Sequence, residues 1–216
     1  MTQTLDNTDA LLEQAAAGDA QALGLLFESH RGRLEMMVRL RLDRRLQGRL
    51  DPADVLQEAY LDVARRFGEY AAGGRDLPFF LWLRLLTGQK LAELHRRHLG
   101  ARMRSAALEV SLFHGPLPRA SSASLAELLI GRLTSASRAA IRAETQLRVQ
   151  EALNSMAPLD REVLVLRHFE MLSNEETARE LGIKPSAASN RHVRALRRLE
   201  EILAQVSGLA DSFQGP

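Results

Sequence analysis

Apolar residues recur at steps of three and four along most of this chain, and this helical period limits the possible folds more than any other feature. The clearest example is the stripe formed by Val55, Ala59, Val63 and Phe67, which a helix places on one face. No segment alternates apolar and polar residues in the way that a half-buried strand requires. The sequence therefore predicts an all-α protein.

Residues with strong capping preferences mark where several of these helices begin and end. Asp51 followed by Pro52 predicts a helix start, because aspartate accepts hydrogen bonds from the first free amides and proline fits the first turn. Gly18 predicts the end of a first helix, and Asp19 predicts the cap of a second. A further helix is expected over residues 79–98.

The composition of the chain changes after Arg104. The stretch from there to residue 137 contains Pro116, Pro118 and a serine-rich run, which is typical of a tether between domains. One or two helical turns are expected inside it, since residues 125–133 form a short apolar piece. From about Ile141 the helical period returns. We therefore expect two small helical domains joined by a flexible linker. The expected limits are 1–104 for the first domain, 105–140 for the linker, 141–206 for the second domain and 207–216 for a frayed tail.

The residue composition excludes several kinds of protein. With no cysteine among its 216 residues, the chain forms neither disulfides nor thiolate zinc sites. No apolar run approaches the ~20 residues that span a bilayer. The polar start from Met1 does not resemble a secretory signal, so a cytoplasmic location is expected. The net charge is only +2, but arginines gather in local patches, and such patches attract phosphate backbones.

The chain carries none of the common catalytic motifs. A phosphate-binding Gly-x-x-x-x-Gly-Lys loop, a Gly-x-Ser-x-Gly elbow and a His-Glu-x-x-His zinc helix are all missing from the sequence. His95 and His98 lie three residues apart on a predicted helix and are in principle metal ligands, but Arg96 and Arg97 between them favour an interaction with nucleic acid. We therefore expect a protein that is not an enzyme and that uses no cofactor and no metal.

A helix-turn-helix is predicted in the second half of the chain. Ser173 and Glu176 have the spacing of a capping box at the start of a short helix, Gly182 supplies a turn, and Pro185 opens a second helix. In this motif the amino-terminal half of the second helix enters the major groove of DNA. The polar and basic residues expected to contact DNA from this helix are Ser186, Ser189, Asn190, Arg191, Arg194 and Arg198.

The sequence of this region resembles the fourth domain of bacterial sigma factors. The resemblance covers residues 159–167, 172–183 and 190–199, and it implies that the second helix recognises the −35 promoter element. Family members often have a basic residue where Ser189 stands, so the usual −35 sequence preference is not expected to carry over unchanged. A helix-turn-helix of this kind also resembles the output domain of LuxR-type regulators, so the first half of the chain decides the class.

The segment from Asp51 to Leu61 resembles the polymerase-binding helix of sigma domain 2. The two matching blocks, joined by a short linker with no third domain between them, give the layout of the extracytoplasmic-function (ECF) sigma factors. The resemblance implies docking to the β′ clamp coiled coil and the β flap of core RNA polymerase, with promoter DNA and an anti-sigma factor as further candidate partners. The residues expected to bind polymerase are Asp51, Asp54, Leu56, Gln57, Glu58 and Leu61.

The segment from Phe79 to Leu83 and the basic helix after it resemble the part of sigma domain 2 that opens and recognises the −10 element. The residues expected to contact −10 DNA are Arg84, Gln89, Lys90, Arg96 and Arg97. Gln89 matches a position where the family often has the asparagine of a base pocket. Trp82 is a candidate for base stacking, but its spacing with Phe79 and Leu86 favours a place in the core.

Two alternatives to a sigma factor stay open on the residues alone. A stand-alone helix-turn-helix regulator predicts a sensor or dimerisation region in the first half, and none is visible. A helical adaptor would use the basic patches for protein or RNA contacts, and it would not need both ordered blocks. A small helical hydrolase is a more distant alternative, because no acid, base and nucleophile can be named.

Overall fold

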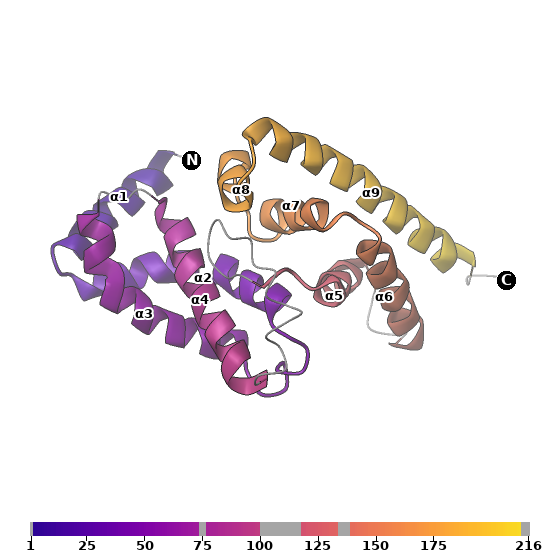
Figure 1. Cartoon of the computed structure of the whole chain (residues 1–216), viewed down its shortest axis with the longest axis horizontal. Helices are drawn as coiled ribbons and strands as arrows, with labels where there is room; N and C mark the ends of the chain where they lie inside the picture. Colours follow the sequence, from indigo (N-terminus) through magenta and orange to yellow (C-terminus); the bar gives the residue numbers. More distant parts are fainter. Residues whose placement is uncertain (1, 74–76, 100–117, 134–138, 213–216) are drawn as a thin grey trace. The chain divides into compact units, whose positions relative to one another are not determined.

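The structure is a computed structural model that describes residues 2–73, 77–99, 118–133 and 139–212, and it divides into two compact units, Met1–Pro118 and Arg119–Pro216. Within the described residues every regular element is a helix, with no strand (Figure 1). The all-α prediction is therefore confirmed. We describe each unit by itself.

Among the residues that the structure describes, the first unit contains four helices: α1 (Thr2–Ala16), α2 (Ala20–Arg41), α3 (Pro52–Ala72) and α4 (Phe79–Leu99). The predicted caps are present. Asp19 accepts hydrogen bonds from the amides of Gln21 and Ala22 at 2.8 and 3.2 Å, after Gly18 has turned the chain with φ +101°. Asp51 caps α3 and accepts from the amide of Ala53 at 2.8 Å. These short-range bonds explain why the helix starts could be predicted from the sequence.

The core of the first unit lies where α2, α3 and α4 pack together. The predicted stripe of α3 is buried, with Val55, Ala59 and Val63 fully inaccessible and Phe67 5% exposed. Trp82 of α4 is also buried and stacks on Tyr70, with ring centroids 4.5 Å apart. Each large apolar side chain buried in this way contributes about 1.5–3 kcal/mol. Trp82 therefore belongs to the core.

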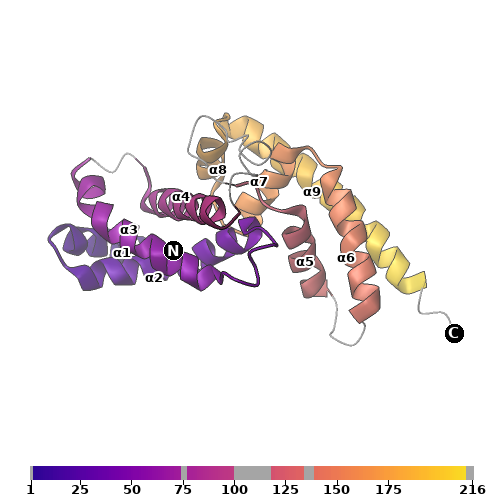
Figure 2. The same cartoon turned by 60° about the horizontal axis from the view of Figure 1, so that its bottom comes forward.

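In the described part of the second unit there are five helices: α5 (Ser122–Leu133), α6 (Ala139–Asn154), α7 (Pro158–His168), α8 (Asn174–Leu181) and α9 (Pro185–Ser212). Helix α5 packs along α6, and α9 packs against α6, α7 and α8 (Figure 2).

The structure differs from the predicted linker and tail. Helix α5 falls inside the 105–140 range that was expected to be linker. This part of the chain is an ordered helix because its apolar residues Leu125, Ala126 and Ile130 are buried and it packs on α6. Residues 100–117 and 134–138 of that range lie outside the described residues. Helix α9 continues to Ser212, into the range expected to be a frayed tail.

The predicted helix-turn-helix is formed by α8 and α9. The Ser173 hydroxyl accepts from the amide of Glu176 at 3.1 Å, and the Glu176 carboxylate accepts from the amide of Ser173 at 2.7 Å. Gly182 ends α8 in the left-handed conformation with φ +62°, and α9 begins at Pro185. An eight-residue helix is too short to be stable alone, so α8 depends on this cap and on packing against α9.

Among the helices of the described ranges, none has both the length and the apolar character needed to cross a bilayer.

Candidate functional site

A groove of about 430 Å³ lies between α2 and α3 in the first unit. Two distances show that the helices lie close together here. A Cβ added at Gly24 would lie 3.6 Å from the Tyr60 hydroxyl, and the ring of Tyr60 packs edge-on against that of Phe27 with centroids 5.1 Å apart. The groove combines an aromatic floor with polar walls. Its lining residues are Gly24, Phe27, Glu28, Arg31, Ala53, Asp54, Leu56, Gln57 and Tyr60.

Three of the residues predicted to bind polymerase line this groove. Asp54 and Gln57 are exposed on its α3 wall, whereas Leu56 is 2% exposed and belongs to its floor. Leu61 lies one turn further along α3 and is 56% exposed. Asp54, Gln57 and Leu61 therefore form an exposed surface of α3 that is acidic, polar and apolar, whereas Leu56 is too buried to contribute to it.

The other two predicted polymerase contacts are engaged within the unit. Asp51 is the N-cap of α3, and its own amide donates to Asp54 at 3.2 Å. Glu58 lies outside the groove lining and approaches Arg97 of α4 at 3.9 Å. Both side chains are still partly accessible to solvent, but each already interacts with another group of the first unit.

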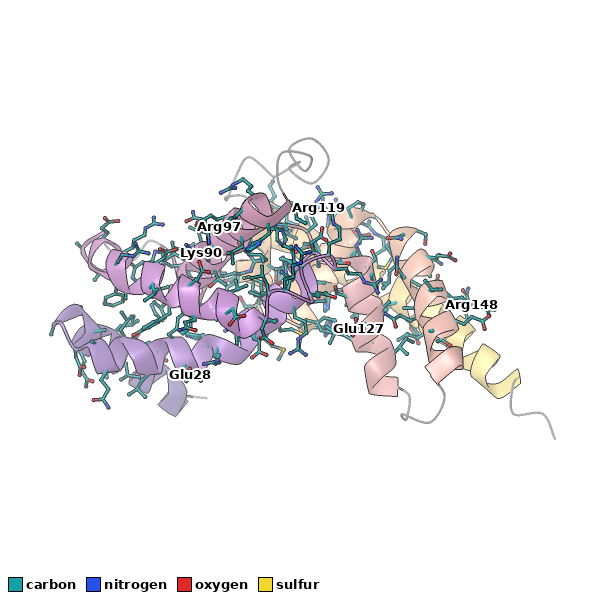
Figure 3. The ribbon with its side chains drawn as sticks, turned by 90° about the horizontal axis from the view of Figure 1, so that it is seen from below. Glu28, Lys90, Arg97, Arg119, Glu127 and Arg148 are labelled. Atoms are coloured by element: carbon teal, nitrogen blue, oxygen red, sulfur yellow. The ribbon has the colours of Figure 1, made fainter. Side chains whose placement is uncertain are left out.

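Lys90 and Arg97 of α4 belong to an ion network with α3 (Figure 3). The Lys90 ammonium donates to Asp62 of α3 and to Glu93, both at 2.9 Å, and Arg97 donates to Glu93 at 2.6 Å. The hydrogen bond to Asp62 raises the pKa of Lys90 although burial opposes it, and the bond from Lys90 lowers the pKa of Glu93. With its side chain 10% exposed, Lys90 holds α3 and α4 together. It is therefore a structural cation in this conformation.

The remaining residues predicted to contact −10 DNA differ in their exposure. Arg84 is 1% exposed, so the prediction that it contacts DNA is not supported by this conformation. Gln89 is half-buried, and its side-chain oxygen accepts from Arg66 at 3.2 Å. Arg96 is exposed and has no ion-pair partner within the described ranges. Of the five predicted residues, only Arg96 offers DNA an uncommitted cation.

The two histidines of α4 lie in different environments. His95 is 8% exposed, and its Nε2 accepts a hydrogen bond from the Asp43 amide at 3.3 Å. Burial lowers the pKa of His95, so its neutral form is favoured. His98 is exposed at the end of the helix. The described residues contain no group of three or more side chains suited to a metal.

In the second unit, the exposed face of α9 carries uncharged polar residues. Ser186, Ser189 and Asn190, all predicted to contact DNA, are exposed. The helical period adds Val193, which is 50% exposed, and Arg197 to the same stripe. Neither residue was predicted to contact DNA, although both follow Asn190 at steps of three and four along the sequence.

The predicted DNA contacts Arg191 and Arg194 are bound to Asp160 in the first turn of α7. Arg191 Nη1 donates to Asp160 Oδ1 at 2.8 Å, while Arg194 donates through Nε and Nη2 at 2.6 and 2.7 Å. We call these three residues the Asp160 bridge. The hydrogen bonds from Arg194 and then Arg191 hold the pKa of Asp160 below its usual value although burial opposes the shift. Asp160 was not predicted to be a site residue.

Arg198, the last predicted DNA contact, also has intramolecular partners. Its guanidinium donates to Glu201 at 2.8 Å and to the Ser155 hydroxyl at 3.3 Å. Because both sides of the Glu201 pair are well exposed, this interaction is weak and exchanges readily with solvent.

A second feature missed by the sequence analysis is the contact between His168 of α7 and His192 of α9. Their Nε2 atoms lie 2.7 Å apart, which requires one nitrogen to donate and the other to accept. Burial and the charge of Arg167 lower the pKa of His168. The pKa of His192 is lowered by burial, then by His168, then by Arg167. This contact is a second link between α7 and α9.

Comparison with known proteins agrees with this arrangement. A family model described as Sigma-70, region 4, matches residues 146–199. The chain is 31% identical over 205 residues to the ECF RNA polymerase sigma factor SigD of Mycobacterium tuberculosis, covering 94% of this chain and 88% of SigD. It is 28% identical over 193 residues to the ECF RNA polymerase sigma factor BldN of Streptomyces coelicolor, covering 89% of this chain and 64% of BldN.

A solved structure shares the fold. The structure of CnrH in complex with the cytosolic domain of CnrY superposes with a TM-score of 0.55 at 22% identity, covering 92% of this chain and 98% of that chain. The similarity to SigD extends over nearly the whole of both proteins, and the region 4 match, residues 146–199, includes α7, α8 and the first half of α9. This chain therefore belongs to the ECF family of RNA polymerase sigma factors.

Proposed function

We propose that this protein binds core RNA polymerase and directs it to promoters with two recognition elements, a −10 element bound by the first unit and a −35 element bound by the second. The family itself acts in transcription initiation by RNA polymerase. The observation that carries the finer proposal is that the α2–α3 groove lies where the sequence predicted polymerase binding.

The groove suits a basic helical partner with apolar side chains. Asp54 and Gln57 supply an acceptor-rich wall, and the aromatic floor and exposed Leu61 supply apolar contact area. An interface with a central apolar contact and a polar rim is typical of specific protein–protein docking. We assign this surface to the β′ clamp coiled coil of polymerase.

At the −10 element we propose that Arg96 contacts the DNA backbone and that Gln89 contacts a base, for which Gln89 must first leave Arg66. The glutamine amide offers both a donor and an acceptor, as base recognition requires. Lys90 and Arg97 support the helix from within, since both are paired with Glu93.

At the −35 element we propose that the exposed stripe of α9 enters the major groove. Asparagine pairs with adenine through two hydrogen bonds, serine donates or accepts, and an apolar side chain contacts the thymine methyl group. Asn190, Ser189 and Val193 provide these three functions on one face. We also propose that the second unit contacts the β flap of polymerase.

We also propose that the protein acts in the cytoplasm, where polymerase and promoters are, and that an anti-sigma factor regulates it. The structure of CnrH contains the cytosolic domain of CnrY, which shows that a protein of this fold forms a complex with another polypeptide. For this chain, a regulatory partner that covers part of the α2–α3 surface would block polymerase docking.

Co-elution with core polymerase tests the docking proposal. Wild-type protein is expected to co-elute with bacterial core enzyme in gel filtration, and the Asp54→Ala/Gln57→Ala variant is expected to elute alone. Glu69→Ala is the matched control, because it removes one negative charge from an exposed position further along the same helix. Loss of co-elution in the control as well, or co-elution of the groove variant, would contradict the assignment of this surface.

A further inference from the structure

Asp160 lies far in the sequence from the recognition helix that it contacts. It stands 31 and 34 residues before Arg191 and Arg194, in the first turn of α7. Its side chain is 7% exposed, whereas the side chains of its two arginine partners are 30% and 60% exposed. One buried carboxylate therefore holds two guanidinium groups that would otherwise extend into solvent.

The position of these arginines on α9 shows what the bridge does. Ala188, Ala195 and Ile202 are buried and recur every seven residues, so they define the core-facing line of the helix. Arg191 and Arg194 lie on the flank beside this line and reach back to α7. The opposite line presents Asn190, Val193 and Arg197.

Free arginines on this helix would bind the phosphates of DNA of any sequence, in addition to any guanine that they reach in the major groove. A cation that neutralises a phosphate adds affinity that depends on salt and carries no sequence information. In the Asp160 bridge, Arg194 already uses Nε and Nη2, and Arg191 uses Nη1, so both side chains are fixed and partly neutralised.

We propose that Asp160 is a positioning residue that sets the specificity of DNA recognition by holding Arg191 and Arg194 against α7. This inference rests on the proposed DNA-binding function of α9. With the two arginines held by Asp160, fewer cations of α9 reach phosphates, and the exposed side chains of Ser186, Ser189 and Asn190 contribute more to the choice of sequence.

The test measures binding of the full-length chain to a random-sequence 30-base-pair duplex by fluorescence anisotropy over a range of salt concentrations. In Asp160→Asn, up to two cations become available. The log–log salt slope is expected to steepen by about 0.9 per new phosphate contact, and affinity at 100 mM salt is expected to rise on the order of tenfold per contact. A duplex selected from a random pool by the wild type should gain less, so that the ratio of specific to non-specific affinity falls.

Three control variants separate positioning from structure and from net charge. Glu162→Gln makes the same change in net charge on the same helix, where its carboxylate accepts from the Ala120 amide, and it should leave the slope unchanged. Asp160→Glu keeps the carboxylate and should restore weak non-specific binding. Adding Arg191→Gln and Arg194→Gln to Asp160→Asn should remove the gain.

Several outcomes would overturn the proposal. If Asp160→Asn retains wild-type helicity but binds random duplex no more tightly and with an unchanged slope, the bridge is only structural. If that variant does not fold, Arg191→Gln/Arg194→Gln in the wild-type background decides: a slope reduced by about 1.8 would show that both arginines already bind phosphates. Failure of the wild type to bind any duplex, even at low salt, would instead remove the DNA-binding function of α9 itself.

Discussion

Replacing Lys90 by methionine tests whether this residue stabilises the first unit, as the structure indicates, or contacts DNA, as the sequence predicted. Methionine keeps an unbranched apolar stem but loses the ammonium that bonds Asp62 and Glu93 at 2.9 Å. Because Lys90 joins α3 to α4, its substitution should lower the free energy of unfolding of the first unit.

The size of this effect follows from the exposure of the three side chains. A buried hydrogen bond to a charged group contributes about 1.5–3 kcal/mol. Asp62 and Glu93 are 27% and 41% exposed, so water screens both pairs and rehydrates the carboxylates after the substitution. We therefore expect Lys90→Met to cost about 2 kcal/mol in total for the two bonds.

Urea unfolding followed by tryptophan fluorescence measures this change. The chain has one tryptophan, Trp82, which is buried on α4 and stacked on Tyr70, so its emission reports this unit. With a urea dependence of about 2 kcal/mol per molar, the midpoint should fall by about 1 M. Arg96→Met is the matched control on the same helix, and an exposed substitution of this kind should change stability by less than about 0.5 kcal/mol.

In a DNA-binding assay, the two variants should change places. Arg96→Met should weaken salt-dependent binding of the protein to DNA, whereas Lys90→Met should leave binding of the folded protein nearly unchanged. If Lys90→Met unfolds at the wild-type urea concentration and loses DNA binding as Arg96→Met does, then Lys90 is a DNA contact and the structural account of the network is wrong.

Two further predictions concern the second unit. The pKa values of His168 and His192 are lowered by folding, so the unfolded chain binds more protons below pH 6.5. Their contribution to stability is therefore complete above pH 6.5 and declines as pH falls through the folded pKa values. Calorimetry should show a flatter pH dependence of Tm for His168→Gln/His192→Gln than for wild type, and equal dependence would refute the assignment. Met171 has φ +58° and is 64% exposed, so Met171→Gly should relieve backbone strain and stabilise the protein by about 1 kcal/mol. A lower urea midpoint in this variant would count against that reasoning.

The sequence predicted the helices and the turn well, because their signals act over a few residues. The caps at Asp19, Asp51 and Ser173 and the left-handed Gly182 all depend on bonds or dihedrals within one turn. Helix α5 was expected as no more than one or two turns inside a tether, because the prolines and serines around it suggested a linker, although Ala126 and Ile130 are four residues apart and both are buried.

Which basic residues are buried or paired with a carboxylate could not be predicted in the same way. Charge patterning placed cations on α4 and α9, but it does not show which cations the fold neutralises. Arg84 and Lys90 are buried because α4 is enclosed on most sides, and Arg194 meets its carboxylate across 34 residues of sequence. Such pairings depend on how helices pack, and no local pattern encodes them.

The central claim is that this protein gives core RNA polymerase its promoter specificity, and in vitro transcription tests it most directly. Purified core enzyme should be incubated with the protein and with genomic DNA from its source, followed by mapping of transcript 5′ ends. The account predicts discrete start sites that appear only when the protein is added and that share two upstream sequence elements. Transcripts with no discrete starts, under conditions where the protein is bound to polymerase, would contradict it.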